Sequence, residues 1–191
     1  MLKAPKLLSE EVVLSKFGKE VVSRGYEVNG KEEEFICWGG AKKGQKISPT
    51  MIFAITVDQE VIAVKQFRYG VNQFLIEIPG GCPKANETSK EVAQQELLEE
   101  TGYQAENLIE ISWDFPFEPA ACFTFYNVVI ALGCKKVAEP KLDPTELLEP
   151  LVVSLPKWFE MIRQGEIKDT KTLALTLVAL SFNHLKIPLY L

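Results

Sequence analysis

The stretch GCPKANETSKEVAQQELLEETGY, from Gly81 to Tyr103, contains a glycine turn, a helix and a cluster of carboxylates in one short segment. Thr88 and Glu91 form the Thr-x-x-Glu pattern of a capping box, in which each side chain bonds an otherwise unpaired backbone N–H. Gly102 ends the expected helix, because glycine tolerates the left-handed conformation that follows a last helical turn. The segment therefore predicts a capped helix that carries several acids.

Three of these acids share one side of the expected helix. At about 100° per residue, Glu96, Glu99 and Glu100 fall within an arc of roughly 100°. Val92 and Ala93 lie within or beside this arc, whereas a solvated acidic face would lack apolar neighbours. We therefore expect a covered helix whose crowded carboxylates require a cation, and oxygen ligands at this density suit Mg²⁺ or Mn²⁺. The alternative is a surface helix with solvated acids, since Glu is a good helix former.

Composition restricts the classes of protein that fit. The chain has 191 residues, 47% hydrophobic and 25% charged, which is typical of a globular domain. A net charge of −5 argues against broad nucleic-acid binding but allows a small phosphorylated substrate beside metal ions. The first residues lack an apolar segment, and the apolar stretch 173–182 is too short to span a membrane. We therefore expect a cytoplasmic protein without membrane or nucleic-acid partners.

Cysteine and histidine usage argues against other chemistries. The four cysteines are widely spaced and form no CxxC pair, which predicts reduced thiols in the core or in loops. His184 is the single histidine of the sequence, so a zinc site or a histidine-based triad is not expected.

The rest of the chain predicts a mixed α/β fold. Asn29-Gly30 is a strong hairpin signal between two strands. Strands and helices follow one another without regular βα alternation, which favours a mixed-sheet α/β sandwich over a doubly wound parallel fold. The expected strands are 20–28, 33–38, 51–57, 61–66, 74–78, 108–113, 123–132 and 148–153, and the further helices are 156–163 and 170–182, the second with Asp169 as N-cap.

The segment Gly81–Tyr103 resembles the Nudix box, in which a glycine, five residues, a glutamate and seven residues precede Arg-Glu-apolar-x-Glu-Glu-x-Gly-apolar. Every fixed position matches except Gln95, which stands where the family has arginine. The resemblance implies a Nudix-type α/β/α sandwich and a Mg²⁺-dependent hydrolase that cleaves the pyrophosphate bond of a nucleoside diphosphate derivative. Water attacks one phosphorus, and the metal ion neutralises phosphate charge and lowers the pKa of that water.

The same resemblance assigns roles to the acids. It implies that Glu96 and Glu100 are the principal metal ligands and that Glu99 is a further ligand or positions the water, so these three form the catalytic set. It also implies that the Gly80 carbonyl adds a metal ligand and that Glu87 supports the helix end and a metal-bound water.

The resemblance covers roughly residues 20–183 and points to the ADP-ribose and nucleotide-sugar pyrophosphatase branch. Its motifs there are QFRY at 66–69, EIPGG at 77–81 and GEIKDTKT at 165–172. It implies that Arg68 holds a substrate phosphate or base through its planar fork, and that Glu77 meets a ribose hydroxyl or a metal-bound water. Pro119 matches a proline of the branch's substrate loop. A surface ion pair is the alternative for Arg68.

The resemblance also implies a domain organisation. Residues 1–45 would form N-terminal strands that contribute to a homodimer, and residues 46–191 would form the catalytic domain, within one compact domain overall.

Two departures from the family pattern bear on activity. Gln95 can hydrogen-bond but brings no positive charge, so we expect stronger repulsion among the acids and a higher Mg²⁺ demand than in a Gln95→Arg variant. No acid follows Pro119 in its strand, which leaves the general base open: either Glu118 or Glu146 substitutes, or Glu99 positions the water. A Nudix domain that binds a nucleotide or a protein partner without catalysis is the competing hypothesis.

Aromatic residues surround the same loop. Phe115, Phe117, Phe123 and Phe125 either stack on a base or pack in the core, and core packing is favoured because aromatic residues in strands usually pack.

Overall fold

The computed structural model describes residues 3–42, 45–84 and 86–182, and His184 lies outside the described residues. Contacts divide the chain into two compact units, Met1–Ser48 with Asp114–Tyr126, and Pro49–Trp113 with Asn127–Leu191. The segment 114–126, which the sequence placed in the larger domain, thus groups with the N-terminal strands. Backbone bonds explain this grouping, since Trp38 N donates to Ala121 O and Phe123 N donates to Trp38 O, both at 2.9 Å.

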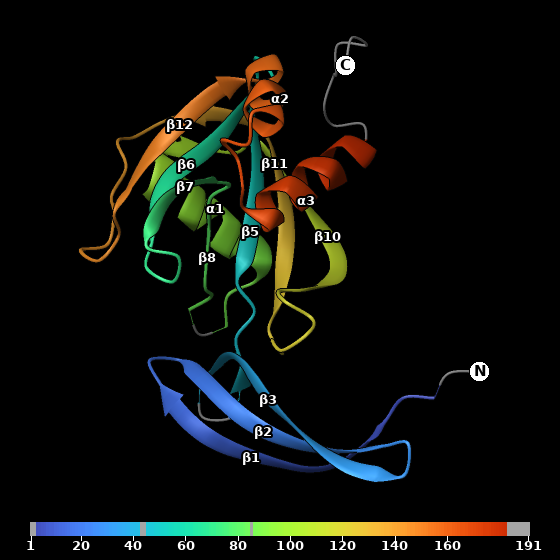
Figure 1. Cartoon of the computed structure of the whole chain (residues 1–191). Coiled ribbons are helices and arrows are strands. Elements are labelled where there is room, and N and C mark those ends of the chain that lie inside the picture. The colour runs from blue at the N-terminus through green and yellow to red at the C-terminus, as the bar shows by residue number, and fades with distance from the viewer. Residues whose placement is uncertain (1–2, 43–44, 85, 183–191) are drawn as a thin grey trace. The chain divides into compact units, whose positions relative to one another are not determined.

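The first unit is an antiparallel sheet of β1 (Lys6–Lys16), β2 (Lys19–Val28), β3 (Lys31–Lys42) and β4 (Gln45–Lys46) in sequential order (Figure 1). The predicted hairpin at Asn29-Gly30 is confirmed, and both residues have the positive φ that a tight hairpin turn requires. Strand β1 was missed because its residues are exposed throughout and do not alternate between apolar and polar.

The larger unit is built on a sheet with the order β10-β11-β5-β6-β12. Its strands are β5 (Thr50–Thr56), β6 (Glu60–Arg68), β10 (Asn107–Pro116), β11 (Phe125–Lys136) and β12 (Leu148–Ser154), and the ends of β10 and β11 belong to the first unit. Strands β5 and β11 are parallel, whereas β6 is antiparallel to both β5 and β12. Short strands β7 (Gln73–Glu77), β8 (Gly80–Gly81) and β9 (Tyr103–Gln104) pair with β6, β5 and β11. This mixed pairing confirms the predicted mixed sheet.

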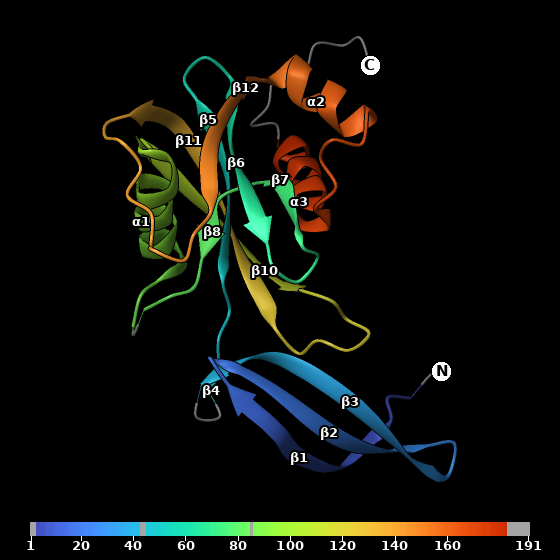
Figure 2. The same cartoon turned by 60° about the vertical axis from the view of Figure 1, so that its left-hand side comes forward.

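Helices cover both faces of this sheet. Helix α1 (Ser89–Thr101) lies on one face, and α2 (Leu155–Arg163) and α3 (Thr170–Ser181) lie on the other (Figure 2). Alternate residues of β5 explain the two layers: Ile52 and Ala54 pack in the cluster with Leu97 of α1, while the Phe53 ring contacts Trp158 of α2 at 6.5 Å between centroids. The predicted α/β/α sandwich is therefore confirmed. No helix within the described residues is long and apolar enough to cross a membrane.

Candidate active site

Helix α1 forms as its sequence predicts. Thr88 N donates to Glu91 Oε2 at 2.8 Å and Glu91 N donates to Thr88 Oγ1 at 3.3 Å, which completes the capping box. At the other end, Gly102 adopts φ 76° and its N–H donates to Leu98 O at 2.9 Å. The two caps fix the length and direction of the helix, and with them the positions of its acids.

Glu100 is buried at the base of the site. It is 3% exposed, and its Oε2 accepts a hydrogen bond from Gly80 N at 3.1 Å. Burial raises the pKa of this carboxyl group to about 8, and the charges of Glu96 and Glu146 add to the rise. The Gly80 hydrogen bond and the Arg68 guanidinium oppose it. The expectation that the acidic face of the helix is partly covered is confirmed at this residue.

Glu96 is half-buried against residues 81–84, which we call the glycine loop together with residues 86 and 87. A methyl group at Gly81 would lie 2.1 Å from Glu96 Oε1, so a side chain at position 81 would displace the carboxylate from this place. Burial raises the pKa of Glu96 to about 7, and the charges of Glu99, Glu146 and Asp143 contribute to the rise. A half-buried carboxyl group that is crowded by like charges favours the binding of a cation.

Glu96 and its neighbour Glu99 line a cavity of about 600 Å³ within the larger unit, whereas Glu100 is not among its lining residues. Its lining combines residues of the glycine loop, of α1 and of the segment that precedes β12, namely Gly81, Cys82, Lys84, Glu96, Glu99, Lys141, Leu142, Asp143 and Glu146. Four carboxylates and two ammonium groups therefore line one space, and the excess negative charge favours a divalent cation.

The segment before β12 is held against the C-terminal end of α1. Val137 N and Ala138 N both donate to Gly102 O, at 2.9 and 3.1 Å, and Lys141 N donates to Glu99 O at 2.7 Å. A methyl group at Gly102 would lie 2.1 Å from Ala138 O. Gly102 thus serves both the helix cap and this close approach, which together place the segment that carries Glu146 over the acids of α1.

The donor set fits Mg²⁺ or Mn²⁺ by its chemistry, because it consists of carboxylate oxygens in excess over cations. Within the described residues, no three His, Cys, Asp or Glu side chains stand close enough together to hold a metal ion as they are placed. The acids therefore face a common space without converging on one point.

Gln95 and Glu87 make local hydrogen bonds beside the acids. Gln95 Nε2 donates to Glu99 Oε1 at 2.9 Å, so glutamine does retain a bond to a neighbouring acid, as expected. Glu87 Oε2 accepts from Lys84 N at 2.6 Å and holds the glycine loop closed on itself. Gln95 carries no positive charge, so the arginine of the Nudix pattern is not replaced by another cation at position 95.

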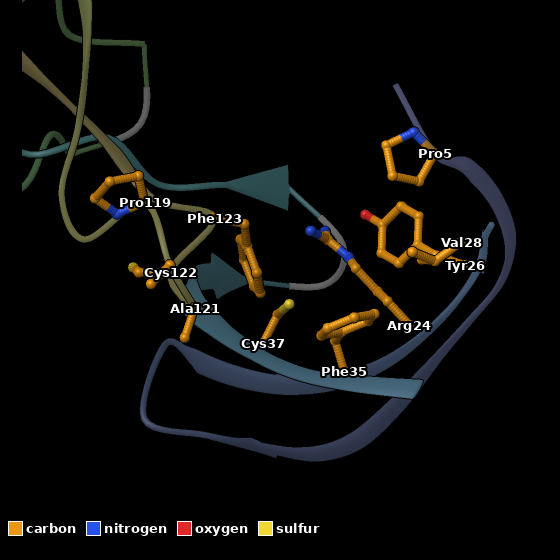
Figure 3. A pocket seen from close by; sticks show the side chains of 11 residues that line it. Pro5, Arg24, Tyr26, Val28, Phe35, Cys37, Pro119, Ala121, Cys122 and Phe123 are labelled. Carbon is orange, nitrogen blue, oxygen red and sulfur yellow. The ribbon is translucent and has the colours of Figure 1, made fainter. Parts of the chain in front are cut away.

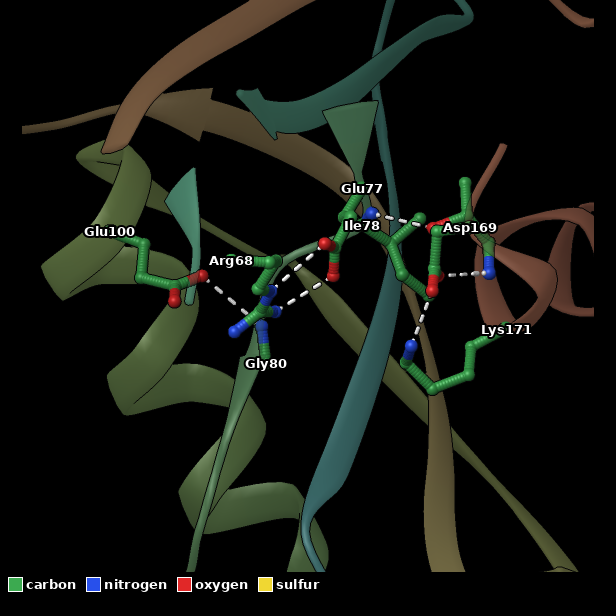
Figure 4. A network of polar contacts seen from close by, with 8 residues as sticks. Arg68, Glu77, Ile78, Gly80, Glu100, Asp169 and Lys171 are labelled. Carbon is green, nitrogen blue, oxygen red and sulfur yellow. Dashed lines mark hydrogen bonds and ion pairs between the residues drawn. The ribbon is translucent and has the colours of Figure 1, made fainter. Parts of the chain in front are cut away.

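Arg68 and Glu77 form an ion pair with two hydrogen bonds (Figure 4). Arg68 Nε donates to Glu77 Oε1 at 2.8 Å and Arg68 Nη2 donates to Glu77 Oε2 at 2.7 Å, while Glu77 is 1% exposed. The Arg68 pKa is raised although its burial works against the charged form, because Glu77, Glu100 and Asp169 surround it with negative charge. The ion pair considered for Arg68 is present, but its partner is buried rather than on the surface.

The same network reaches the start of α3. Asp169 Oδ2 accepts from Thr172 N at 2.8 Å, which confirms Asp169 as the N-cap, and Asp169 also pairs with Lys171. Ile78 N donates to Thr172 Oγ1 at 3.1 Å and ties this helix end to the chain that follows β7 (Figure 4).

Pro119 belongs to the first unit and not to the residues that line the acidic cavity. It lines a cavity of about 480 Å³ inside that unit, together with Arg24, Tyr26 and Phe123 (Figure 3). Glu118 lies in the same loop, where both of its carboxylate oxygens accept bonds from backbone N–H groups, at 3.1 and 2.9 Å.

The loop phenylalanines differ in how deeply they are buried. Phe123 is buried against Val22 and lies under the Arg24 guanidinium, as core packing predicts. Phe117 and Phe125 are 38% and 40% exposed, so for them the core prediction is wrong.

Lys84, Lys141 and Asp143 were not predicted as site residues, although the structure places all three at the acidic cavity. Lys84 lies inside the glycine loop that decided the fold, so its spacing was available in the sequence. Lys141 and Asp143 had no such signal, because only the docking of their segment on α1 brings them to the cavity.

A mixed sheet between helix layers, with the acids of a capped helix facing a cavity beside a glycine loop, is the class of domain that the Nudix box specifies. A family model described as NUDIX domain matches residues 47–169, and the chain belongs to this family.

Curated relatives resemble part of the chain. An ADP-ribose pyrophosphatase of Bacillus subtilis is 32% identical over 122 residues, 63% of this chain and 65% of that protein. A methanol dehydrogenase activator of Bacillus methanolicus is 29% identical over 124 residues and is covered to 65% as well. An ADP-sugar pyrophosphatase of Mus musculus is 31% identical over 128 residues, 61% of this chain and 55% of that protein. The matches thus span less than two thirds of these relatives.

A solved structure titled as an ADP compounds hydrolase shares the fold. The two chains superpose with a TM-score of 0.80 at 19% identity, and the match covers 95% of each.

Proposed function

We propose that this protein hydrolyses the pyrophosphate bond of a nucleoside diphosphate derivative, such as ADP-ribose or a nucleotide sugar, with Mg²⁺ or Mn²⁺ as cofactor. The observation that carries the proposal is the acidic cavity, where Glu96 and Glu99 of the family's defining helix meet Glu146 beside the glycine loop. Membership in the NUDIX family and the names of two relatives, an ADP-ribose and an ADP-sugar pyrophosphatase, support the same substrate class.

In this proposal Glu96, Glu99 and Glu100, with the Gly80 carbonyl, hold the metal ion. The ion, when bound, neutralises phosphate charge and lowers the pKa of the attacking water. Its charge also compensates the three carboxylates, whose crowding the chain itself relieves only in part. Glu87 supports the site indirectly, because its bond to Lys84 N fixes the glycine loop against which Glu96 packs.

Glu146 is the general base that we propose. It lines the cavity with Glu96, and its charge raises the pKa of both Glu96 and Glu100, so its carboxylate lies within electrostatic reach of both. One of its oxygens accepts from Asp143 N at 2.9 Å, which orients the group. Glu118 is not among the residues that line the acidic cavity, and Glu99 is assigned to the metal ion in this proposal.

Arg68 is the residue that we propose for holding a substrate phosphate, with Glu77 as its partner. The paired carboxylate fixes the guanidinium fork, and the third guanidinium nitrogen is not used by the two bonds to Glu77. We also propose that Pro119 contacts the substrate. The N-terminal strands, residues 1–45, would form a homodimer, and residues 46–191 would form the catalytic domain. The proposed location is cytoplasmic, without nucleic-acid partners.

Turnover of a substrate panel tests the proposal. The purified protein is incubated with Mg²⁺ and nucleoside diphosphate derivatives, and the products are identified by mass. We expect two phosphorylated products from at least one compound, and loss of this activity in Glu100→Gln but not in the matched variant Glu106→Gln, whose carboxylate is exposed and pairs at 3.9 Å with Lys135.

A domain that only binds its ligand is the second candidate. The uncharged Gln95 favours it, and one relative is named as a methanol dehydrogenase activator, which supports the same candidate. Thermal stabilisation by a nucleotide without turnover of any panel member would support this candidate and contradict hydrolysis.

A further inference from the structure

Lys84 brings a positive charge to the acids of α1. It does so from a loop and not from the helix, where the Nudix pattern has its arginine and this chain has Gln95. Lys84 belongs to the glycine loop and lines the acidic cavity together with Glu96 and Glu99. The loop is fixed at this residue, because Lys84 N donates to Glu87 Oε2 at 2.6 Å and Glu87 N donates to Lys84 O at 3.3 Å. The backbone of Lys84 is thereby anchored at the edge of the cavity, and its side chain is exposed there.

The acids next to Lys84 lack the compensation that an arginine at position 95 would give. Gln95 offers Glu99 a single neutral hydrogen bond. Glu96 is surrounded by the negative charges of Glu99, Asp143 and Glu146, and Lys84 is the cation whose field opposes them. Lys141 also lines the cavity and its backbone N–H is bound to Glu99 O, but Lys84 is the cation named among the main influences on the pKa of Glu96.

We infer that Lys84 supplies, from the glycine loop, the positive charge that the Nudix pattern otherwise places at position 95 of the helix. Lys84 is then a positioning residue: it keeps the carboxylates of Glu96 and Glu99 together in the metal-free protein. This inference rests on the proposed metal site, but it does not require that the protein hydrolyse anything.

A charge exchange between the two positions tests it. Thermal unfolding is measured in EDTA at low salt for wild type, Lys84→Met, Gln95→Arg and the double variant. We expect Lys84→Met to lower the midpoint by about 2–4 °C, and Gln95→Arg to restore most of this loss in the double variant. Lys84→Arg should behave as wild type because it keeps the charge, and Lys90→Met, at an exposed lysine of the same region, should also have no effect.

Salt and metal distinguish charge compensation from loss of packing. In about 0.5 M KCl the difference between wild type and Lys84→Met should shrink by at least about half, because salt screens exposed charges. Saturating Mg²⁺ should shrink it too, since the ion then compensates the acids. An unchanged midpoint in Lys84→Met, a loss that persists in high salt, or a loss that Gln95→Arg does not restore would each overturn the inference.

The proposed function fails by a different result. If Mg²⁺ stabilises none of the variants, the metal site is wrong, while the measurements in EDTA still decide the role of Lys84.

Discussion

Two groups of acids in the larger unit differ in how their charge is balanced. Glu77 is 1% exposed and forms two bonds with Arg68, and Asp169 pairs with Lys171 and caps α3. Glu96 and Glu100 make no ion pair within the described part of the chain, and burial and mutual repulsion raise their pKa values to about 7 and about 8. The chain thus pairs one acidic group directly with its own cations, whereas the other is balanced only in part, by the fields of Lys84 and Arg68.

The sharpest test of this contrast is Glu146→Gln, which alters the proposed base without touching the paired group. We expect kcat to fall by about 10²–10⁴-fold, because a positioned base contributes on this scale. Mg²⁺ should still stabilise the variant, since the acids of α1 remain. Steady-state kinetics on the best panel substrate, with thermal shift in Mg²⁺, measure both.

Glu139→Gln is the matched control for this prediction, because Glu139 lies in the same segment but is exposed and pairs with Lys136. Its kcat should equal that of wild type. A Glu146→Gln enzyme that keeps kcat within about twofold would remove Glu146 from the mechanism.

The paired group is tested by Arg68→Met. This change leaves the Glu77 carboxylate buried without its partner, so we expect a loss of about 3 kcal/mol in the free energy of unfolding. Adding Glu77→Gln should recover part of the loss, because a neutral amide costs less to bury than an unpaired charge. Urea titration of the single and double variants provides the values.

Lys65→Met serves as the comparison on the same strand, because Lys65 pairs with Glu149 at the exposed surface at 3.4 Å. We expect it to cost less than about 1 kcal/mol. If Arg68→Met lowers the free energy of unfolding no more than Lys65→Met does, the ion pair of Glu77 does not stabilise the protein as the contrast requires.

The last test concerns the pH dependence of the metal-free protein. The unfolded chain releases the protons of Glu96 and Glu100 near the ordinary pKa of 4.5, whereas the folded chain holds them until about pH 7 and 8. The folded state therefore binds more protons in this window, and these two groups make stability decline as pH rises from about 4.5 to about 8.

We expect this decline as a fall in the midpoint of thermal unfolding in EDTA, about 2–4 °C for each kcal/mol lost. Glu100→Gln should flatten it, and Mg²⁺ should reverse it at pH 8 more than at pH 5, because metal binding requires deprotonated ligands. A steeper rather than flatter profile in Glu100→Gln would contradict the assigned cause.

Much of the fold could be predicted from local patterns. The capping box at Thr88, the stop at Gly102 and the turn at Asn29-Gly30 are each fixed by a few neighbouring residues, and all three are present. Strand β1 and the grouping of 114–126 with the N-terminal strands could not be read in the same way. Exposed strands carry no clear alternation, and backbone pairing between distant segments leaves no local signal.

The sequence by itself determined the acidic helix, its caps and the glycine loop, because these depend on contacts between residues a few positions apart. Only the tertiary structure decided which acids are balanced and which are not. The pairing of Arg68 with Glu77 and the docking of the Glu146 segment on the end of α1 join elements distant in the chain. Burial of Glu100 likewise depends on the sheet beneath the helix, and that burial is the main cause of its raised pKa.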